Sequence, residues 1–420
     1  MNPWASRPFR WLVVGRTVDA FGNAIGPIAL AFAVLRLGGS ATQLGLVMAV
    51  YAGLDVVTSL VAGVLGDRWS RRSLMVWTSA ALGVVQGAVA LTWLLGGAGI
   101  GLFGAVAGVT AVLSALRAPA AEAILSQTVP REMLPTAITW RRLAANTALT
   151  AGFAVGGILV AALGPGWAIA VDALTFVIAA GCYAQVRVLA VGTGDQIEGE
   201  QAWGEQVEGE STSARPASML TELREGFAEV FSRTWLWLLL VQAMIYHLLY
   251  GGVQGVLGPL VVRRDHGEAT WGWAMAALMA GFILGGLVCL RYRPRRLLLA
   301  GTLFLAATAL FPLALALPWT GPVGVVVIIV GAFVHGFGLE VFSVQWDTAI
   351  QTGVPADRLA RVMSLDAVGS FVMRPIGLAV TGPISALVGV RAWLVVVAVV
   401  MFVVEVAPVA APSVRDLTRT

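Results

Sequence analysis

The chain contains no lysine and little charge of any kind. Only 12% of its 420 residues are charged, and all 27 basic residues are arginines. A soluble domain carries roughly 25% charged residues, so most of this surface does not face water. The net charge of +4 is spread over short loops and does not form the dense basic patch that binds nucleic acid. We therefore expect no nucleic-acid partner.

Cysteine and the common signatures of catalysis are also scarce. Cys182 and Cys289 lie near the ends of apolar runs, and nothing in their spacing indicates a disulfide or a metal pair. No His/Cys cluster has the spacing of a zinc site, and no G-x-x-x-x-G-K-[ST] phosphate-binding loop is present, so ATP is not expected to drive the protein directly. We predict a protein that is not an enzyme and that holds neither a metal nor a cofactor.

Long hydrophobic runs dominate what is present. Hydrophobic residues make up 58% of the chain, and a membrane-spanning helix needs about 20 apolar residues in succession. Strands of this length would leave backbone groups unpaired in lipid or would show alternation, which is absent here. The predicted fold is an all-α polytopic membrane protein with twelve transmembrane helices, at 9–35, 42–64, 74–95, 98–118, 141–163, 167–186, 235–260, 270–290, 297–317, 322–348, 364–388 and 391–411.

Arginine placement predicts the orientation of these spans. If the N-terminus is inside, 21 arginines fall on the inner side and four on the outer side. Inner loops of membrane proteins carry the excess of basic residues. We therefore predict a multi-pass protein of the cytoplasmic (inner) membrane, embedded in the lipid bilayer, with both termini cytoplasmic.

The spans divide into two sets of six that resemble each other. Val129-Pro130 and Val354-Pro355 occur in similar segments, 225 residues apart. We predict an N-terminal six-helix half at 1–187, a cytoplasmic linker at 188–234, a C-terminal six-helix half at 235–411 and a cytoplasmic tail at 412–420. The end of the linker has apolar residues at helical spacing, which predicts an amphipathic helix on the inner membrane surface. Two such halves around a central cavity are typical of transporters.

The tightest charge cluster, "GVLGDRWSRRSLM" at 63–75, lies between the second and third spans. Its pattern resembles the loop 2–3 signature of the major facilitator superfamily. Segments such as "FRWLVVGRTVDAFGNAI", "GGILVAALGPGWAIAVDALTF" and "WDTAIQTGVPADRLARVMS" resemble the drug- and siderophore-exporting branch, which includes macrolide-efflux-type and enterobactin-exporter-type proteins. The resemblance runs from about residue 9 to residue 410 and implies the major facilitator fold.

The resemblance also implies a role for the cluster. In the family, the acid of this motif lies near the N-terminus of helix 11, and an arginine pairs with an acid on helix 4, here Arg71 with Glu122. These contacts would clamp the two halves together on the inside and favour the outward-open state. The alternative is that the arginines only anchor topology. The residues predicted for the clamp are Gly63, Asp67, Arg68, Arg71, Arg72, Arg117 and Glu122.

Ionisable side chains inside the spans are candidates for proton coupling, because a charge in hydrocarbon is costly and marks function by default. Arg16, Asp19 and Asn23 share one face of the first helix. Either Arg16 and Asp19 form a structural pair, or Asp19 binds a proton or cation. His247 and Glu340 are further candidates.

A second group of polar residues is predicted to line the substrate cavity. In the family, helices 1, 4, 7 and 10 line the cavity, which implies a substrate path along the polar stripe of the seventh span. Ordinary packing between helices is the alternative for the aromatic members. The candidates are Asn23, Gln242, Tyr246, Tyr250, Gln254, His335, Ser343 and Arg374. Asp172 and Glu405 fall on helices that usually face lipid, so we expect structural roles for both.

Together these features predict a secondary active transporter that acts as a monomer. It would export a small amphipathic compound, such as a drug, a natural product or a siderophore, by alternating access in exchange for protons. Two alternatives remain open: an uptake permease of the same fold, and a membrane sensor or scaffold that does not transport.

Overall fold

The computed structural model describes residues 3–66, 69–186 and 227–417. In these ranges the fold is helical throughout, and twelve helices are long and apolar enough to cross a membrane. The first six are α1 (Arg7–Arg36), α2 (Ala41–Gly66), α3 (Arg71–Leu94), α4 (Ile100–Ala123), α5 (Leu134–Leu163) and α6 (Pro165–Ala184). Two of the other six spans are composite. One consists of α9 (Thr234–Gly252), a π-turn (Val253–Leu257) and α10 (Gly258–Asp265), and the other of α12 (Leu297–Ala306), a 3-10 turn (Ala307–Ala309) and α13 (Leu310–Ala316). The remaining four are α11 (Ala269–Cys289), α14 (Gly321–Gly353), α15 (Ala356–Val388) and α16 (Val390–Val406). The predicted fold class is therefore confirmed.

Serine side chains begin two of the helices. The Ser6 hydroxyl accepts a hydrogen bond from the backbone N–H of Phe9 at the start of α1. Ser70 does the same for the N–H of Ser73 at 3.2 Å at the start of α3. Each serine satisfies one of the backbone donors that a helix N-terminus leaves free. Ser70, which belongs to the charge cluster at 63–75, therefore acts as the N-cap of α3.

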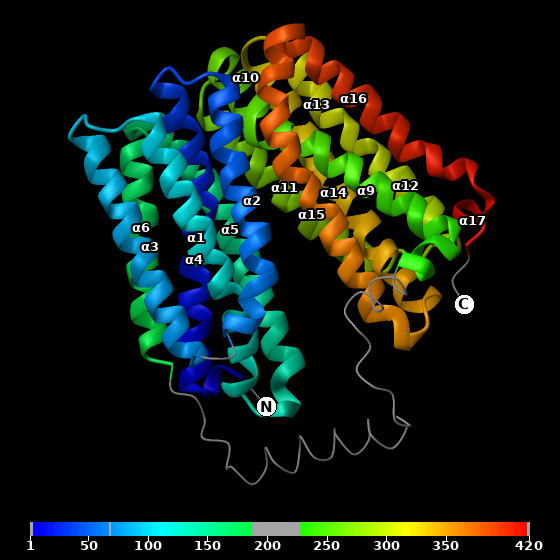
Figure 1. The fold of residues 1–420 in the computed structure, drawn as a ribbon, viewed down its shortest axis with the longest axis horizontal. Helices are drawn as coiled ribbons and strands as arrows, with labels where there is room; N and C mark the ends of the chain where they lie inside the picture. The colour runs from blue at the N-terminus through cyan, green and yellow to red at the C-terminus, as the bar shows by residue number, and fades with distance from the viewer. Residues whose placement is uncertain (1–2, 67–68, 187–226, 418–420) are drawn as a thin grey trace.

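The helices form two groups that converge at one end and diverge at the other (Figure 1). Helices α1 to α6 make up one group, and α9 to α16 the other. The start of α1 and the C-terminal part of the described chain both lie toward the diverging end. The groups pack on each other mainly through α2 with α15 and α5 with α11.

Left-handed glycines repeat between the two groups. Gly96 and Gly321 both have positive φ and lie 225 residues apart, and the same holds for Gly164 and Gly389. This separation equals that of Pro130 and Pro355 in the sequence. Equivalent turns thus precede α4 and α14, and α6 and α16. The repeated turns support the prediction of a duplicated six-helix unit.

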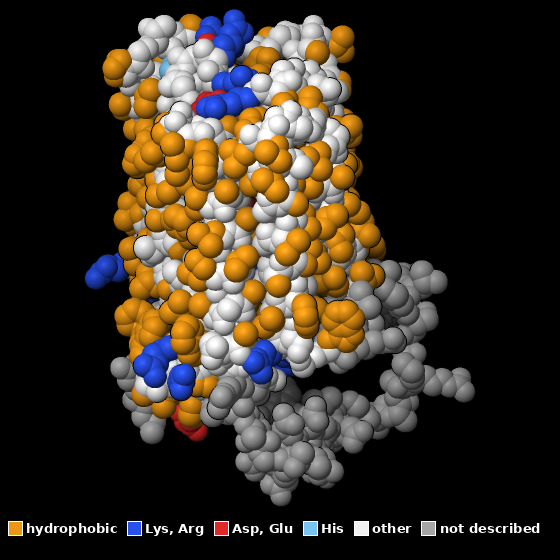
Figure 2. Space-filling view, turned by 90° about the vertical axis from the view of Figure 1, so that its left-hand side faces the viewer, with side chains coloured by type: hydrophobic (Ala, Val, Ile, Leu, Met, Phe, Trp, Pro, Cys, Tyr) orange, Lys and Arg blue, Asp and Glu red, His pale blue; other side chains and the backbone are white. Residues whose placement is uncertain are grey.

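The face of the molecule seen in Figure 2 is largely apolar along the middle of the helices, and most of its charged side chains lie toward the two ends. Trp77, Val84 and Leu387 are each more than 70% exposed, although such side chains are buried in a soluble protein. An exposed apolar band of this extent matches a hydrocarbon surrounding. The interior of the molecule is apolar as well, with Phe32, Leu44 and Phe311 fully buried in the largest core cluster.

Candidate functional site

A buried ion pair joins α1 to α4. The guanidinium of Arg117 donates to the Asp19 carboxylate, and the two side chains are 6% and 3% exposed. Arg117 also lies over the ring of Phe176 on α6, 5.6 Å from its centroid. The close charge-assisted contact neutralises both groups inside the first half. Asp19 therefore pairs with Arg117 in this conformation, and the predicted pairing of Arg16 with Asp19 is corrected.

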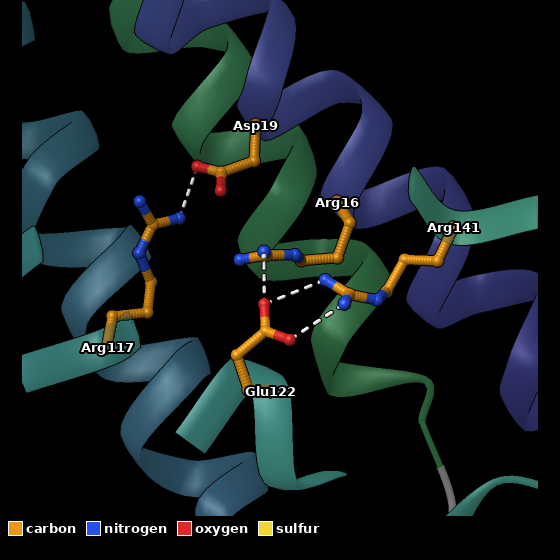
Figure 3. Close-up of polar contacts among 5 residues, drawn as sticks. All are labelled: Arg16, Asp19, Arg117, Glu122 and Arg141. Atoms are coloured by element: carbon orange, nitrogen blue, oxygen red, sulfur yellow. Dashed lines mark hydrogen bonds and ion pairs between the residues drawn. The ribbon is translucent and has the colours of Figure 1, made fainter. Parts of the chain in front are cut away.

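Arg16, one turn before Asp19 on α1, instead contacts Glu122 (Figure 3). Arg16 lies 3.2 Å from Glu122 Oε1, and Arg141 of α5 makes a two-pronged contact with both carboxylate oxygens at 2.8 and 2.7 Å. Glu122 is 58% exposed whereas Arg141 is 8% exposed. The acid on α4 is thus held by α1 and α5 of its own half.

The loop 2–3 arginines contact backbone carbonyls. Arg71 donates to the carbonyl oxygen of Ala123 at 3.3 Å, next to Glu122 in the chain, and Arg72 donates to the carbonyl oxygen of Ala184 at the end of α6. The expected Arg71–Glu122 ion pair is therefore replaced by a contact with the neighbouring backbone. Gly63 lies near the end of α2. Asp67 and Arg68 lie outside the described residues, so the predicted clamp between the halves stays a prediction.

A cavity of about 320 Å³ lies between the two halves. Its wall is largely apolar and aromatic, with Phe103, Phe153, Phe176, Trp271, Phe371, Met48 and Met275 among the lining residues. A few polar side chains from both halves interrupt this wall: Asn23, Tyr51, Asp55, Gln86, Thr110, Asp172, Gln254 and Arg374. The Arg374 guanidinium donates to Gln254 Oε1 at 3.1 Å. Apolar walls with few polar anchors are typical of small-molecule sites.

Three of the predicted cavity residues line this site, namely Asn23, Gln254 and Arg374. The others lie elsewhere, which corrects their predicted placement. The Ser343 hydroxyl donates to the Leu339 carbonyl one turn earlier in α14. Two proton-coupling candidates, His247 and Glu340, also lie outside the cavity wall. His247 donates from Nδ1 to the carbonyl oxygen of Ala243 at 2.8 Å, and Glu340 lies against the glycines of α11.

The remaining four form a buried polar cluster inside the second half, made of Gln242, Tyr246, Tyr250 and His335 together with Thr308 and Glu405. His335 donates from Nδ1 to the Thr308 carbonyl at 3.0 Å, and its Nε2 lies 2.7 Å from the Tyr246 hydroxyl. Because Nδ1 of a neutral imidazole carries the proton here, Nε2 accepts. Glu405 accepts from the Thr308 hydroxyl at 2.7 Å. Helical spacing in the sequence predicted this polar stripe on α9 and placed it on the substrate path. In the structure the stripe faces α14 and α16 instead.

Sequence reasoning missed Asp172 as a cavity residue. Its side chain is 2% exposed and lines the cavity from α6, a helix expected to face lipid. The signal was available, because Asp172 is the sole acid of the apolar run "WAIAVDALTFVIAA". An ionisable residue in such a run indicates function by default.

The converging end of the bundle is closed by backbone contacts between the halves. A β-carbon at Gly272 of α11 would lie 2.5 Å from the Phe153 carbonyl oxygen and 2.6 Å from Cα of Gly157 on α5. Only glycine permits this approach. Arg36 also crosses between the halves, with Nε 3.0 Å from Glu268 Oε1. One end is therefore tightly packed while the helices separate toward the other.

Twelve apolar spans in two groups around a central mixed cavity are the architecture of a membrane transporter. Residues 12–378 match the model of the Major Facilitator Superfamily. The chain therefore belongs to the major facilitator superfamily, as the resemblance predicted.

Relatives with assigned names support this placement. The multidrug efflux pump Tap of Mycobacterium tuberculosis is 25% identical over 413 residues, covering 95% of this chain and 92% of that protein. The solved structure of the nucleoside transporter NupG has a TM-score of 0.72 at 12% identity, covering 98% of this chain and 99% of that one. A bacterial homologue of the lysosomal transporter Spinster, solved in an inward-facing and unoccupied conformation, has a TM-score of 0.70 at 15% identity and covers 100% and 99%. At these identities the two structures establish the fold alone.

Proposed function

We propose that this protein exports a small amphipathic compound across the cytoplasmic membrane. The observation that carries the proposal is the central cavity, whose aromatic and thioether wall is broken by acids from the first half and by Arg374 from the second. Such a wall suits a bulky compound with one cationic or polar group. Similarity to a multidrug efflux pump supports export over other transport modes.

The transport cycle follows from the two ends of the bundle. Most arginines lie in the loops on the side of the membrane where both termini lie. This excess favours a cytoplasmic location for the diverging end. The described conformation is then inward-facing, with the substrate entering from the cytoplasm between the separated halves. Breaking the contacts of Gly157 and Gly272 and of Arg36 and Glu268 would open the opposite side. Rocking of one half against the other around the cavity completes alternating access.

Proton exchange is the energy source that we propose. One charge that crosses a potential of 100 mV releases about 2.3 kcal/mol, and an inward proton flow can drive an outward flow of drug. Two acids in the cavity wall, the half-buried Asp55 and the buried Asp172, offer groups that exchange protons. Coupling through an acid in the cavity wall links proton release to substrate binding.

The direct test uses inverted membrane vesicles from a bacterial host that produces the chain. After respiration has acidified the lumen, the vesicles are expected to accumulate ethidium, rhodamine 6G or tetraphenylphosphonium. Nigericin, which collapses the pH gradient, should abolish the accumulation. Vesicles without the protein are the control.

Two results would contradict the proposal. Accumulation only in right-side-out vesicles would identify an uptake permease. Absence of transport of all three cations in either orientation, by protein that is folded and inserted, would favour a sensor or scaffold.

A further inference from the structure

Asp172 occupies a socket between α6 and α1. A β-carbon at Gly26 would lie 2.9 Å from its Oδ2, and one at Gly22 would lie 2.8 Å from its Oδ1. The two glycines, one turn apart on α1, therefore leave room for the Asp172 carboxyl group and, at Gly22, also for the Thr175 hydroxyl, and a side chain at either glycine would displace these groups. The carboxyl is 2% exposed, and it lies in the wall of the cavity.

The carboxyl group lacks a counter-charge of its own. Oδ1 of Asp172 is buried and has no hydrogen-bond partner in the described part of the chain. The nearby cation, Arg117 of α4, is already engaged by Asp19 of α1. Tyr51 of α2 lines the same cavity as Asp172, and its phenol carries no positive charge. Helices α3 and α5 contribute Gln86 and Phe153 to the cavity wall, neither of which titrates.

Asp172 differs in this respect from three other acids on the described helices of the first half. Asp19 is neutralised by Arg117, and Glu122 is held by Arg16 and Arg141. Asp55 shares the cavity with Arg374 and is only half-buried. An unpaired charge at the depth of Asp172 is costly, whereas a protonated carboxyl is neutral. A cation that enters the cavity would supply the missing partner, and the proton would become dispensable.

We propose that Asp172 is the carboxyl group at which a proton and the cationic group of the exported compound replace each other. When the ligand's cation approaches, the proton leaves Asp172 for the cytoplasmic solution and the carboxylate pairs with the ligand. When the ligand departs on the other side, a proton returns. The inference rests on the proposed export function and assigns its coupling site to α6, with Gly22 and Gly26 of α1 as the socket.

The test measures proton release and binding in the same sample. Purified protein in weakly buffered detergent solution is mixed with ethidium, while a pH indicator reports released protons and fluorescence reports binding. The wild type is expected to release close to one proton for each ethidium bound, and its affinity should rise about tenfold for each pH unit over the titrating range. Asp172→Asn should bind ethidium with an affinity independent of pH and without releasing protons. Asp172→Glu should retain proton release.

Asp347→Asn is the matched control, because Asp347 also lies within a span but outside the cavity wall. It should behave as the wild type in both readouts, and gel filtration checks that every variant is folded. Proton release that persists in Asp172→Asn, or that disappears in Asp347→Asn, would overturn the assignment even if vesicles accumulate ethidium normally. Wild-type protein that neither binds nor accumulates any of the three cations would overturn the export proposal as well.

Discussion

Arg117 of α4 is bound to Asp19 of α1, and both side chains are almost completely shielded from solvent. The pair holds the two helices together at a depth where neither charge can exist alone. The two residues are 98 positions apart in the sequence, so no local sequence pattern predicts the pair. Arg16, which is one turn from Asp19 on α1, pairs with Glu122 instead.

Loss of one member of this pair should cost far more than loss of both. Arg117→Gln leaves a buried carboxylate without its cation and is expected to destabilise the fold by about 3–5 kcal/mol. The double variant Asp19→Asn/Arg117→Gln should regain most of that loss. Thermal unfolding of the purified protein in detergent measures the difference, and a strictly additive double variant would show that the two groups do not interact.

The Arg36–Glu268 contact should bias the protein toward closure at the converging end. Arg36 is 34% exposed, so the pair is expected to contribute at most about 1 kcal/mol, or roughly a fivefold change in the ratio of conformations. Glu268→Gln should therefore increase the population open at this end. Distances between spin labels at 163 and 264, in a background without Cys182 and Cys289, report the shift. The charge-swapped pair Arg36→Glu/Glu268→Arg should reverse it.

A side chain at the glycine contact between α5 and α11 should prevent closure altogether. Gly272→Val would place atoms within 3 Å of backbone at Phe153 and Gly157, and backbone cannot move aside as a side chain can. We expect loss of transport with insertion intact, and strong labelling of a cysteine introduced at position 163, at the converging end. Gly181→Ala, where a β-carbon meets nothing within 4 Å, is the control and should transport normally.

The polar cluster of the second half should affect stability and leave ligand affinity unchanged. Tyr246→Phe removes the hydroxyl that contacts His335 and should destabilise the protein by about 1–3 kcal/mol, because a buried acceptor is left unpaired. Arg374→Gln, in the cavity wall, should instead change the apparent affinity for transported cations. Parallel unfolding and transport assays separate the two. A Tyr246→Phe protein of normal stability and weakened affinity would return the cluster to the substrate path.

Glu229, outside the membrane spans, should make stability depend on pH. The hydrogen bond from Arg358 at 2.5 Å, followed by that from Arg233 at 2.8 Å, lowers the pKa of the Glu229 carboxyl below its ordinary 4.5. Because the pKa is lower in the folded state, the stabilisation is complete above the unfolded value and is lost as the pH falls through the folded value. Arg358 is 52% exposed, so we expect no more than about 1 kcal/mol.

Unfolding of Glu229→Gln across the range from about pH 6 to about pH 3 checks this. The wild type should exceed the variant in stability at the upper end, and the difference should shrink toward the lower end. Asp416→Asn, whose partners are exposed, should show little difference at any pH in that range. A constant gap between wild type and Glu229→Gln would contradict the assignment.

Hydropathy predicts the spans of this protein well, because lipid forces every spanning segment to be helical and apolar. Predicted and observed limits agree closely at α1 and α6, and the loop 2–3 motif identified the superfamily. Side-chain direction is harder to predict. Gln242, Tyr246 and Tyr250 share a face of α9 as expected, yet which neighbour that face meets depends on the rotation of the whole helix. Asp172 was misplaced for the same reason, since its helix was assigned to lipid by analogy and not by packing.

The backbone contact between Gly157 and Gly272 has a consequence for the energetics of the cell. Where two main chains touch, no water molecule fits between them, and hydrogen ions cross proteins along files of water molecules. A carrier sealed in this way can stand idle in an energised bilayer without short-circuiting it, whether or not cargo is present. The close contact of these two glycines thus limits the leak of protons across the membrane.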